Sequence, residues 1–309
     1  MPQSSSTFMI AGIEFQTPLL ENIKDEFLSK KSIHLDILRL DQVDSYISGN
    51  KIFKLRYYLE NAIKNNIKTI VTLGGAYSNH LAATAYACKK CGLMSIGIVR
   101  GEEAKNLSPT LQFCLQHGMK LIFLERKLYK HISKKDSIEI PELEELKDFI
   151  IIPEGGYSIE GSSGAESITS FFDQNSYSHI CVPVGTATTL SGIVNTISSA
   201  KVLGFTALKG LNDINERMLF LGTKETNWEI ISAYHFGGYA KYDKNLTNFM
   251  SEFYLKHHVP LDFVYTGKMM FGVYDLIKKE FFENGSRILC MHTGGLQGNK
   301  SLLPGSLPY

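Results

Sequence analysis

The amino-acid sequence predicts an α/β protein with mainly parallel sheets flanked by helices. Short apolar runs bounded by Gly or Pro alternate along the chain with stretches of helical periodicity. Strands that alternate with helices are typical of parallel sheets covered by helices on their faces. At 309 residues the chain exceeds what one hydrophobic core usually supports, so two lobes are expected.

The predicted elements can be followed from end to end. Apolar runs such as IHLDILRL and KTIVTLGG indicate strands, and stretches such as KLRYYLENAIKNN carry apolar residues at helical spacing. The expected strands are residues 33–40, 68–75, 94–101, 120–125, 206–212, 228–234 and 286–295. The expected helices are residues 54–66, 78–91, 108–118, 269–282 and a charged stretch at 138–149. A loop is expected at 151–164, and a strand, a loop and a helix in succession at 179–197.

Charge and composition exclude several classes of function. The formal net charge of +1 gives no electrostatic footprint for nucleic acid or an anionic membrane. No run approaches the roughly 18 apolar residues that span a bilayer, and the first residues lack the basic region of a signal peptide. Five scattered cysteines suit a reducing compartment. We therefore expect a cytoplasmic protein without nucleic-acid or membrane partners.

Cys88 and Cys91 form a CxxC pattern near the end of a predicted helix. A structural zinc site would need a second pair of ligands, and a redox pair usually lies at a helix start, where the helix dipole lowers the thiol pKa. We interpret these cysteines as packing or surface thiols and expect no metal site.

One lysine and three loops carry candidate chemistry, because ligands of α/β sheets collect where strand ends meet helix starts. The lysine ends SGNK (48–51). In LGGAYSNH (73–80), Ser78 or Asn79 either caps a helix or faces an anion together with backbone N–H groups. The loop VGTATTLSG (184–192) offers small residues and hydroxyls suited to a phosphate, without a Walker A or dinucleotide fingerprint. The third loop carries VYTGK (264–268), and we consider it together with the motif HTGG (292–295) near the end of the chain.

In their order these motifs resemble the fold-type-II pyridoxal-phosphate enzymes that include D-cysteine desulfhydrases and 1-aminocyclopropane-1-carboxylate (ACC) deaminases. SGNKxxKL is similar to GGNKxRKL of that family, GGAYSNH to GGxxSNH, VYTGK to VYxGK and HTGG to HxGG, over residues 38–298. The resemblance implies a two-domain, tryptophan synthase β-like fold. It implies a large cofactor-binding domain of residues 1–55 plus 161–309 and a small inserted α/β domain of residues 56–160. It also implies pyridoxal 5'-phosphate as cofactor and a homodimer.

The resemblance assigns the lysine and the first loop. Lys51 would carry the cofactor as a Schiff base, as a loop lysine that burial helps to deprotonate. Lys54 is the rival lysine and an expected phosphate contact. Asn79 would contact the phenolic oxygen of the cofactor, and His80 would join the substrate site in a role left open. Ser78 would hold the substrate carboxylate and assist proton movement, which places it with Lys51, Tyr265 and Tyr239 among the expected catalytic residues.

The resemblance also assigns the remaining loops. The phosphate would be bound by Gly185, Thr186, Ala187, Thr188 and Thr189. This loop departs from the usual Ser-Gly-Gly-Thr of the family, so its path is expected to differ. Tyr265 would lie beside the cofactor ring, and Tyr239 would be either an acid/base group or a packing residue.

Thr266 and Thr293 distinguish members of the family. ACC deaminases carry an acidic residue near the pyridine nitrogen at the first position, and tend to carry Leu at the second. A neutral Thr266 makes a weaker electron sink, which favours β-elimination over ring opening. The resemblance therefore implies D-cysteine desulfhydrase-like deamination of a small amino acid to pyruvate, hydrogen sulfide and ammonium. The alternatives are an ACC deaminase, another small D-amino-acid lyase, and, from a different class, a non-catalytic α/β ligand-binding protein.

Overall fold

The computed structural model describes residues 6–47, 49–133 and 140–309. Its strands are β1 (Thr7–Ile10), β2 (Ile13–Gln16), β3 (Leu19–Asn22), β4 (His34–Arg39), β5 (Thr69–Gly74), β6 (Met94–Arg100), β7 (Met119–Leu124), β8 (Phe149–Ile152), β9 (His179–Val184), β10 (Lys201–Thr206), β11 (Trp228–Ile231) and β12 (Arg287–His292). Its α-helices are α1 (Glu26–Lys30), α2 (Lys51–Lys64), α3 (Asn79–Lys90), α4 (Pro109–Gln116), α5 (Arg126–Ile132), α6 (Pro141–Glu144), α7 (Ile159–Glu166), α8 (Thr188–Thr196), α9 (Ile214–Phe220), α10 (Lys244–His257) and α11 (Thr266–Lys278).

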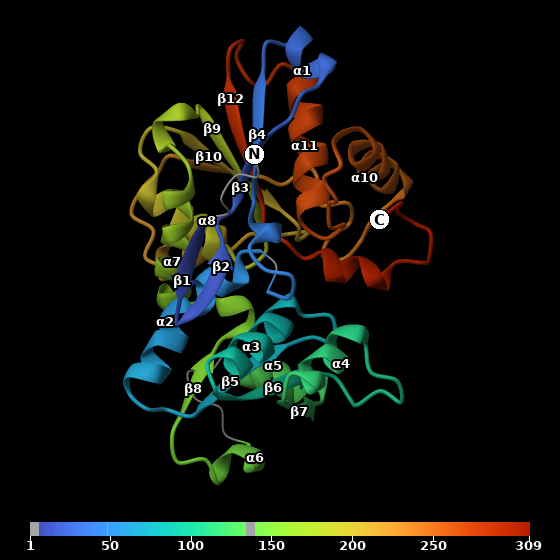
Figure 1. Ribbon diagram of the computed structural model, residues 1–309. Coiled ribbons are helices and arrows are strands. Elements are labelled where there is room, and N and C mark those ends of the chain that lie inside the picture. The colour runs from blue at the N-terminus through green and yellow to red at the C-terminus, as the bar shows by residue number, and fades with distance from the viewer. Residues whose placement is uncertain (1–5, 48, 134–139) are drawn as a thin grey trace.

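Two sheets form the framework. The larger lies in the upper half of Figure 1 and the smaller in the lower half. The larger has the order β11-β10-β9-β12-β4-β3, parallel except for β3, which pairs antiparallel with β4 at one edge. The smaller has the order β7-β6-β5-β8 and is parallel throughout. A separate hairpin pairs β1 with β2. The prediction of mainly parallel sheets flanked by helices is confirmed.

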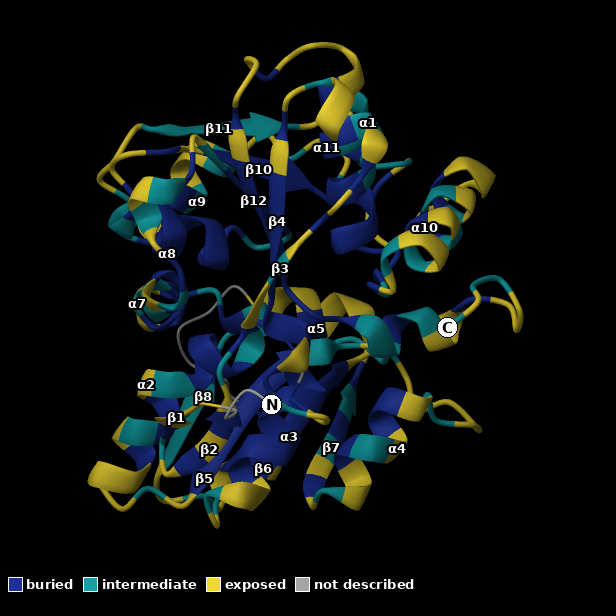
Figure 2. Cartoon of the chain, turned by 45° about the horizontal axis from the view of Figure 1, so that its top comes forward, coloured by how far each residue is buried: buried dark blue, intermediate teal, exposed yellow. Residues whose placement is uncertain are grey.

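The larger sheet is buried on both faces because its strands send alternate side chains to opposite sides. Ile180 and Val182 of β9 pack with residues of α8, whereas Cys181 between them packs with residues of α10 and α11. Figure 2 shows these central strands buried; among the covering helices, α8 is buried almost throughout and α10 carries exposed residues on its outer face. This double cover explains why the strands read as nearly continuous apolar runs.

Helices α2, α7 and α8 pack closely through glycines. A Cβ on Gly164 of α7 would lie 2.1 Å from the backbone oxygen of Phe53 in α2. A Cβ on Gly192 of α8 would lie 2.5 Å from the backbone oxygen of Ser162 in α7. Since backbone cannot move aside as a flexible side chain can, glycine is required at these crossings.

Gly164→Ala is therefore expected to lower the free energy of unfolding by about 1–3 kcal/mol, the usual cost of overpacking. Gly298→Ala is the matched control, because a Cβ there meets nothing within 4 Å, and its effect should stay within about 1 kcal/mol. Urea unfolding of both variants measures the difference. Equal stability of the two variants would contradict the close crossing of α2 and α7.

Several predicted elements need correction. The strand expected at 206–212 lies earlier, at β10, because the apolar run KVLGFT ends where Lys209-Gly210 makes a turn. The charged stretch at 138–149 is helical only at Pro141–Glu144, with residues 138 and 139 outside the described part. The loop expected at 151–164 contains the start of α7.

The two predicted domains correspond broadly to the two sheets, since β5 to β8 all lie within residues 56–160. The boundary expected after residue 55 falls inside α2, which contacts elements on both sides. The domain division stays a prediction. Among the described residues, no helix has the length and apolarity to cross a lipid bilayer.

Candidate active site

The predicted site residues come together in a cleft at the ends of strands from both sheets. Two adjoining hollows share Lys51, Asn79 and Tyr265, and the outer one has a volume of about 450 Å³. The inner hollow is lined by the predicted residues Lys51, Lys54, Asn79, Gly185, Thr186, Ala187, Thr189, Tyr265 and Thr293. The outer hollow adds Ser78, His80 and Tyr239. Thr188 and Thr266 are fully buried and line neither.

Lys51 is the first residue of α2, so the expectation of a loop lysine was wrong by one residue. Gly49, separated from Lys51 by Asn50, has a φ of +89°. A Cβ on Gly49 would lie 1.9 Å from the backbone oxygen of Thr293, so only glycine fits at this position. Ser48, the first residue of the motif, lies outside the described residues. The Lys51 Nζ donates to Asn50 Oδ1 at 2.8 Å, and Asn50 Nδ2 donates to Thr189 Oγ1 at 2.7 Å.

Burial lowers the pKa of Lys51 to about 8, against a smaller opposing effect of the Asp262 carboxylate. About a tenth of its amine is therefore unprotonated at pH 7, far more than for an ordinary lysine, and only this form can act as a nucleophile or base. Lys54 lies one helical turn on, and its Nζ donates to the backbone oxygen of Gly155 at 3.2 Å. Burial and the Lys51 charge hold the pKa of Lys54 well below its usual range.

The loop after β5 begins α3. Ser78 is the N-cap, and its Oγ accepts a hydrogen bond from Leu81 N at 3.3 Å. The Oδ1 atom of Asn79 is buried and has no hydrogen-bond partner among the described residues. A buried acceptor without a partner is costly, so this atom is suited to a ligand that donates a hydrogen bond.

The loop between β9 and α8 carries the threonine hydroxyls. Ala187 adopts the left-handed conformation (φ +70°) that glycine usually occupies, so the loop reaches α8 despite the departure from the family pattern. The Oγ1 atoms of Thr186 and Thr188 are 2.9 Å apart. Gly185 lies against Tyr265, since a Cβ there would lie 3.1 Å from its ring. The loop and the start of α8 line the inner hollow through Gly185, Thr186, Ala187 and Thr189.

Two tyrosines form one wall of the cleft. The rings of Tyr265 and Tyr239 meet edge to face with centroids 6.2 Å apart. Burial raises the pKa of Tyr265 well above its usual range, and Tyr239 adds to the effect. The hydroxyl of Tyr265 therefore keeps its proton at neutral pH and can donate a hydrogen bond.

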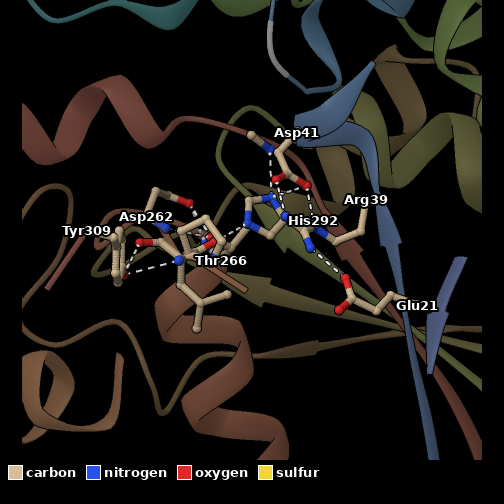
Figure 3. Close-up of polar contacts among 10 residues, drawn as sticks. Glu21, Arg39, Asp41, Asp262, Thr266, His292 and Tyr309 are labelled. Carbon is tan, nitrogen blue, oxygen red and sulfur yellow. Dashed lines mark hydrogen bonds and ion pairs between the residues drawn. The ribbon is translucent and has the colours of Figure 1, made fainter. Parts of the chain in front are cut away.

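Thr266 is turned towards Asp262, as Figure 3 shows. Its hydroxyl donates to Asp262 Oδ2 at 2.5 Å and accepts from Asp262 N at 2.9 Å. The carboxylate also accepts from the backbone N–H groups of Val264, Tyr265 and Thr266 at 2.8–3.0 Å. Asp262 thus caps the start of α11 and fixes the loop that presents Tyr265.

A buried ion-pair network lies behind the HTGG loop (Figure 3). Arg39 binds Asp41 through Nε at 2.9 Å and Nη2 at 2.7 Å, and Glu21 through Nη1 at 2.5 Å. Asp41 Oδ1 lies 3.3 Å from Nδ1 of His292, whose Nε2 contacts the backbone oxygen of Pro260 at 2.7 Å. The network therefore links β4 to both the HTGG loop and the loop before Tyr265.

Sequence reasoning missed some residues of the site. Asp262 was not singled out, because it lies before Tyr265, the N-cap of α11, and so outside the position that a capping pattern indicates. Arg100, at the end of β6, also lines the outer hollow, and no sequence pattern indicated it. Gly155, from the segment expected as a loop at 151–164, lines both hollows.

Cys88 and Cys91 lie at the end of α3, Cys88 buried and Cys91 partly exposed, and both are free. Burial raises the pKa of both thiols. The interpretation as packing thiols rather than a reactive pair fits this environment.

Comparison with known proteins decides the family. A family model described as pyridoxal-phosphate dependent enzyme matches residues 10–294, almost the whole chain. The chain belongs to this family. It is similar to a protein of Pyrococcus furiosus provisionally named 1-aminocyclopropane-1-carboxylate deaminase, at 31% identity over 93% of this chain and 91% of that protein.

Other members of the family are also similar to the chain. A D-cysteine desulfhydrase of Klebsiella pneumoniae is 26% identical over 87% of this chain and 90% of that protein. The crystal structure of an ACC deaminase homologue superposes with a TM-score of 0.74 at 26% identity, covering 91% of this chain and 90% of that one. The fold-type-II assignment is confirmed.

The residues of the cleft fit the cofactor of the family. Lys51 has an amine of lowered pKa that would suit covalent attachment, and the threonine loop has hydroxyls and a helix N-terminus that would suit a phosphate. The buried, unpartnered Oδ1 and the neighbouring amide nitrogen of Asn79 offer a polar contact to the ring substituents. Nothing in this donor set opposes pyridoxal phosphate.

Proposed function

We propose that the chain is a deaminating lyase that acts on D-cysteine or a similar small β-substituted amino acid. The observation that carries the proposal is the position of Lys51. Its amine, with a lowered pKa, lies in one cleft with Ser78, Asn79 and the threonine loop. A ligand-binding protein without catalysis would have no need for an amine activated in this way.

The residues of the cleft take the following roles in the proposal. Lys51 attaches the cofactor through Nζ, and the threonine loop and Lys54 hold its phosphate. Ser78 and the start of α3 bind the substrate carboxylate. Lys51 Nζ would also take the proton from the substrate α-carbon.

The cofactor, when bound, supplies a conjugated ring that delocalises the negative charge left on that carbon. Tyr265 lies beside the ring in this proposal, with its hydroxyl protonated. Tyr239, at the mouth of the cleft, stays a candidate acid/base or packing residue. The overall reaction converts D-cysteine and water to pyruvate, hydrogen sulfide and ammonium.

Thr266 supports cysteine over ACC as the substrate. It carries no charge, and its hydroxyl proton is already committed to Asp262, so it cannot also be donated to another acceptor. The Asp262 carboxylate is itself satisfied by donors of its own loop. A ring whose nitrogen faces the uncharged Thr266 would be a weaker electron sink and would suit the elimination of a good leaving group.

The test offers D-cysteine and ACC side by side to the protein loaded with pyridoxal phosphate. We expect pyruvate and sulfide from D-cysteine, and 2-oxobutanoate from ACC at a rate at least about tenfold lower. Faster turnover of ACC would transfer the proposal to an ACC deaminase. Turnover of D-serine or β-chloro-D-alanine alone would transfer it to another D-amino-acid lyase.

Cofactor attachment is expected to depend on pH in one direction. Only the unprotonated amine of Lys51 attacks a carbonyl, and its pKa is lowered to about 8. The rate should therefore rise about tenfold per pH unit below pH 8 and level off above it. Stopped-flow absorbance of the visible cofactor band measures this rate. A rate still rising steeply at pH 10 would indicate an ordinary, solvated lysine.

The assembly and location expected from the sequence are also proposed here. Five free cysteines support a reducing compartment and hence a cytoplasmic location. A homodimer, as expected for the family, predicts about twice the chain mass of 34.6 kDa in sedimentation velocity. A single species at the chain mass would contradict the dimer.

A further inference from the structure

His80 is held in one orientation and one tautomer by the smaller sheet. Its Nε2 lies 2.9 Å from Thr72 Oγ1, and that hydroxyl donates its proton to the backbone oxygen of Ile152 at 2.8 Å. Because the only proton of the hydroxyl is committed to Ile152, Thr72 must accept from His80. The imidazole therefore carries its proton on Nε2, and Nδ1 presents a lone pair.

The Nδ1 atom has no hydrogen-bond partner among the described residues, and His80 as a whole is only 2% exposed. Lys51 and Lys54, whose charges act on His80, do not donate to this atom: Lys51 donates to Asn50, and Lys54 donates to Gly155. His80 nevertheless lines the outer hollow together with Lys51 and Ser78. A buried acceptor left without a donor at the wall of a ligand cleft indicates that a ligand supplies the donor.

The imidazole is neutral at every pH near neutrality. Burial, together with the charges of Lys51 and Lys54, lowers the pKa of His80 to about 3. It can accept a hydrogen bond, but it cannot protonate a departing group. Such a side chain favours a leaving group that carries its own hydrogen and departs readily as an anion.

We propose that Nδ1 of His80 accepts a hydrogen bond from the S–H group of the substrate and makes the cleft selective for thiol-bearing amino acids. The inference rests on the proposed lyase function and names its substrate class. The cyclopropane ring of ACC has no polar hydrogen, so it leaves Nδ1 unsatisfied. A thiol supplies the missing donor and leaves as hydrosulfide.

The test compares D-cysteine with β-chloro-D-alanine, which carries a chlorine substituent in place of the thiol and therefore has no hydrogen to donate to Nδ1. His80→Phe keeps a ring of similar shape but removes the acceptor. We expect the ratio of kcat/KM for D-cysteine to that for β-chloro-D-alanine to fall about three- to tenfold. An unchanged ratio, with both substrates affected equally, would overturn the proposal and leave His80 a packing or cofactor-site residue.

Two variants of Thr72 test whether the tautomer of His80 governs the selectivity. Thr72→Val removes the acceptor that holds the Nε2 proton, so the ratio should fall in the same direction as in His80→Phe. Thr72→Ser restores the hydroxyl and should restore the ratio. A Thr72→Val protein with the wild-type ratio would show that the tautomer does not govern selectivity.

A binding measurement separates this inference from the proposed reaction. 3-Mercaptopropionate and butyrate both carry a carboxylate but no amine, and only the first has a thiol. Titration calorimetry should show tighter binding of the thiol to the wild-type protein and a loss of that preference in His80→Phe. If D-cysteine is not turned over but the preference is present, the proposed reaction fails while the thiol site stands. If the preference is absent, the thiol site fails.

Discussion

Lys51→Ala is expected to lose deaminating activity by about 10³-fold or more and to lose the visible band of the bound cofactor. The variant removes both the amine that attaches the cofactor and the base that removes the α-proton, and one positioned base alone is worth about 10²–10⁴-fold. Absorbance spectra with added pyridoxal phosphate and pyruvate release from D-cysteine measure the two losses.

Lys54→Met is the matched control, since Lys54 lies in the same cleft one turn along α2. This variant should bind the cofactor more weakly but keep the band of the lysine-bound form. A Lys51→Ala protein that keeps the band, beside a Lys54→Met protein that loses it, would move the attachment to Lys54.

Arg39→Met is expected to lower the free energy of unfolding by about 3–5 kcal/mol at neutral pH, as for other broken buried ion pairs. The side chains of Arg39 and Asp41 are only 4% and 2% exposed, so the variant leaves the Asp41 carboxylate buried without its two hydrogen bonds from Arg39. Chemical unfolding measures the loss. Because the network also holds His292 and the loop before Tyr265, the variant should bind the cofactor more weakly as well.

The sign of the pH dependence gives a second check on Arg39→Met. Burial alone would raise the pKa of Asp41, but His292 and Arg39 lower it below its usual range. The stabilisation is therefore present above the unfolded-state pKa of about 3.9 and is lost as the pH falls through the lower folded-state pKa. The difference between wild type and variant should shrink below about pH 4.

Lys30→Met supplies the control for this prediction, because the Lys30–Glu26 pair is largely exposed. Surface pairs of this kind contribute at most about 1 kcal/mol, so the change should be small. An Arg39→Met protein as stable as Lys30→Met would contradict the role given to the buried network.

The sequence predicted the parallel core of the fold because its strands and helices carry strong local signals. β5, β9 and β12 are buried apolar runs, and the helix α8 follows β9 as expected. The hairpin of β1 and β2 and the helix α10 were not predicted. The hairpin strands have four residues each, too few for a clear local pattern. Helix α10 does carry a local signal, because Asp243 caps it and its buried residues Leu246, Met250 and Phe253 have helical spacing.

The candidate site divides in the same way. Motif order alone brought Lys51, Ser78, Asn79 and Tyr265 to attention, and the structure places all four at one cleft. The hydrogen bond between Thr266 and Asp262 could not be predicted, since rotamers and donor directions depend on tertiary contacts. The same holds for the tautomer of His80, which Thr72 and Ile152 determine from a neighbouring strand pair.

The most direct test of the central claim locates the cofactor on the chain. The protein is mixed with pyridoxal phosphate, reduced with borohydride, which converts a lysine–cofactor linkage to a stable amine, and digested for peptide mass spectrometry. We expect the added mass on Lys51. Modification at Lys54 or at surface lysines instead, with Lys51 unmodified, would contradict the assignment of Lys51 as the catalytic lysine.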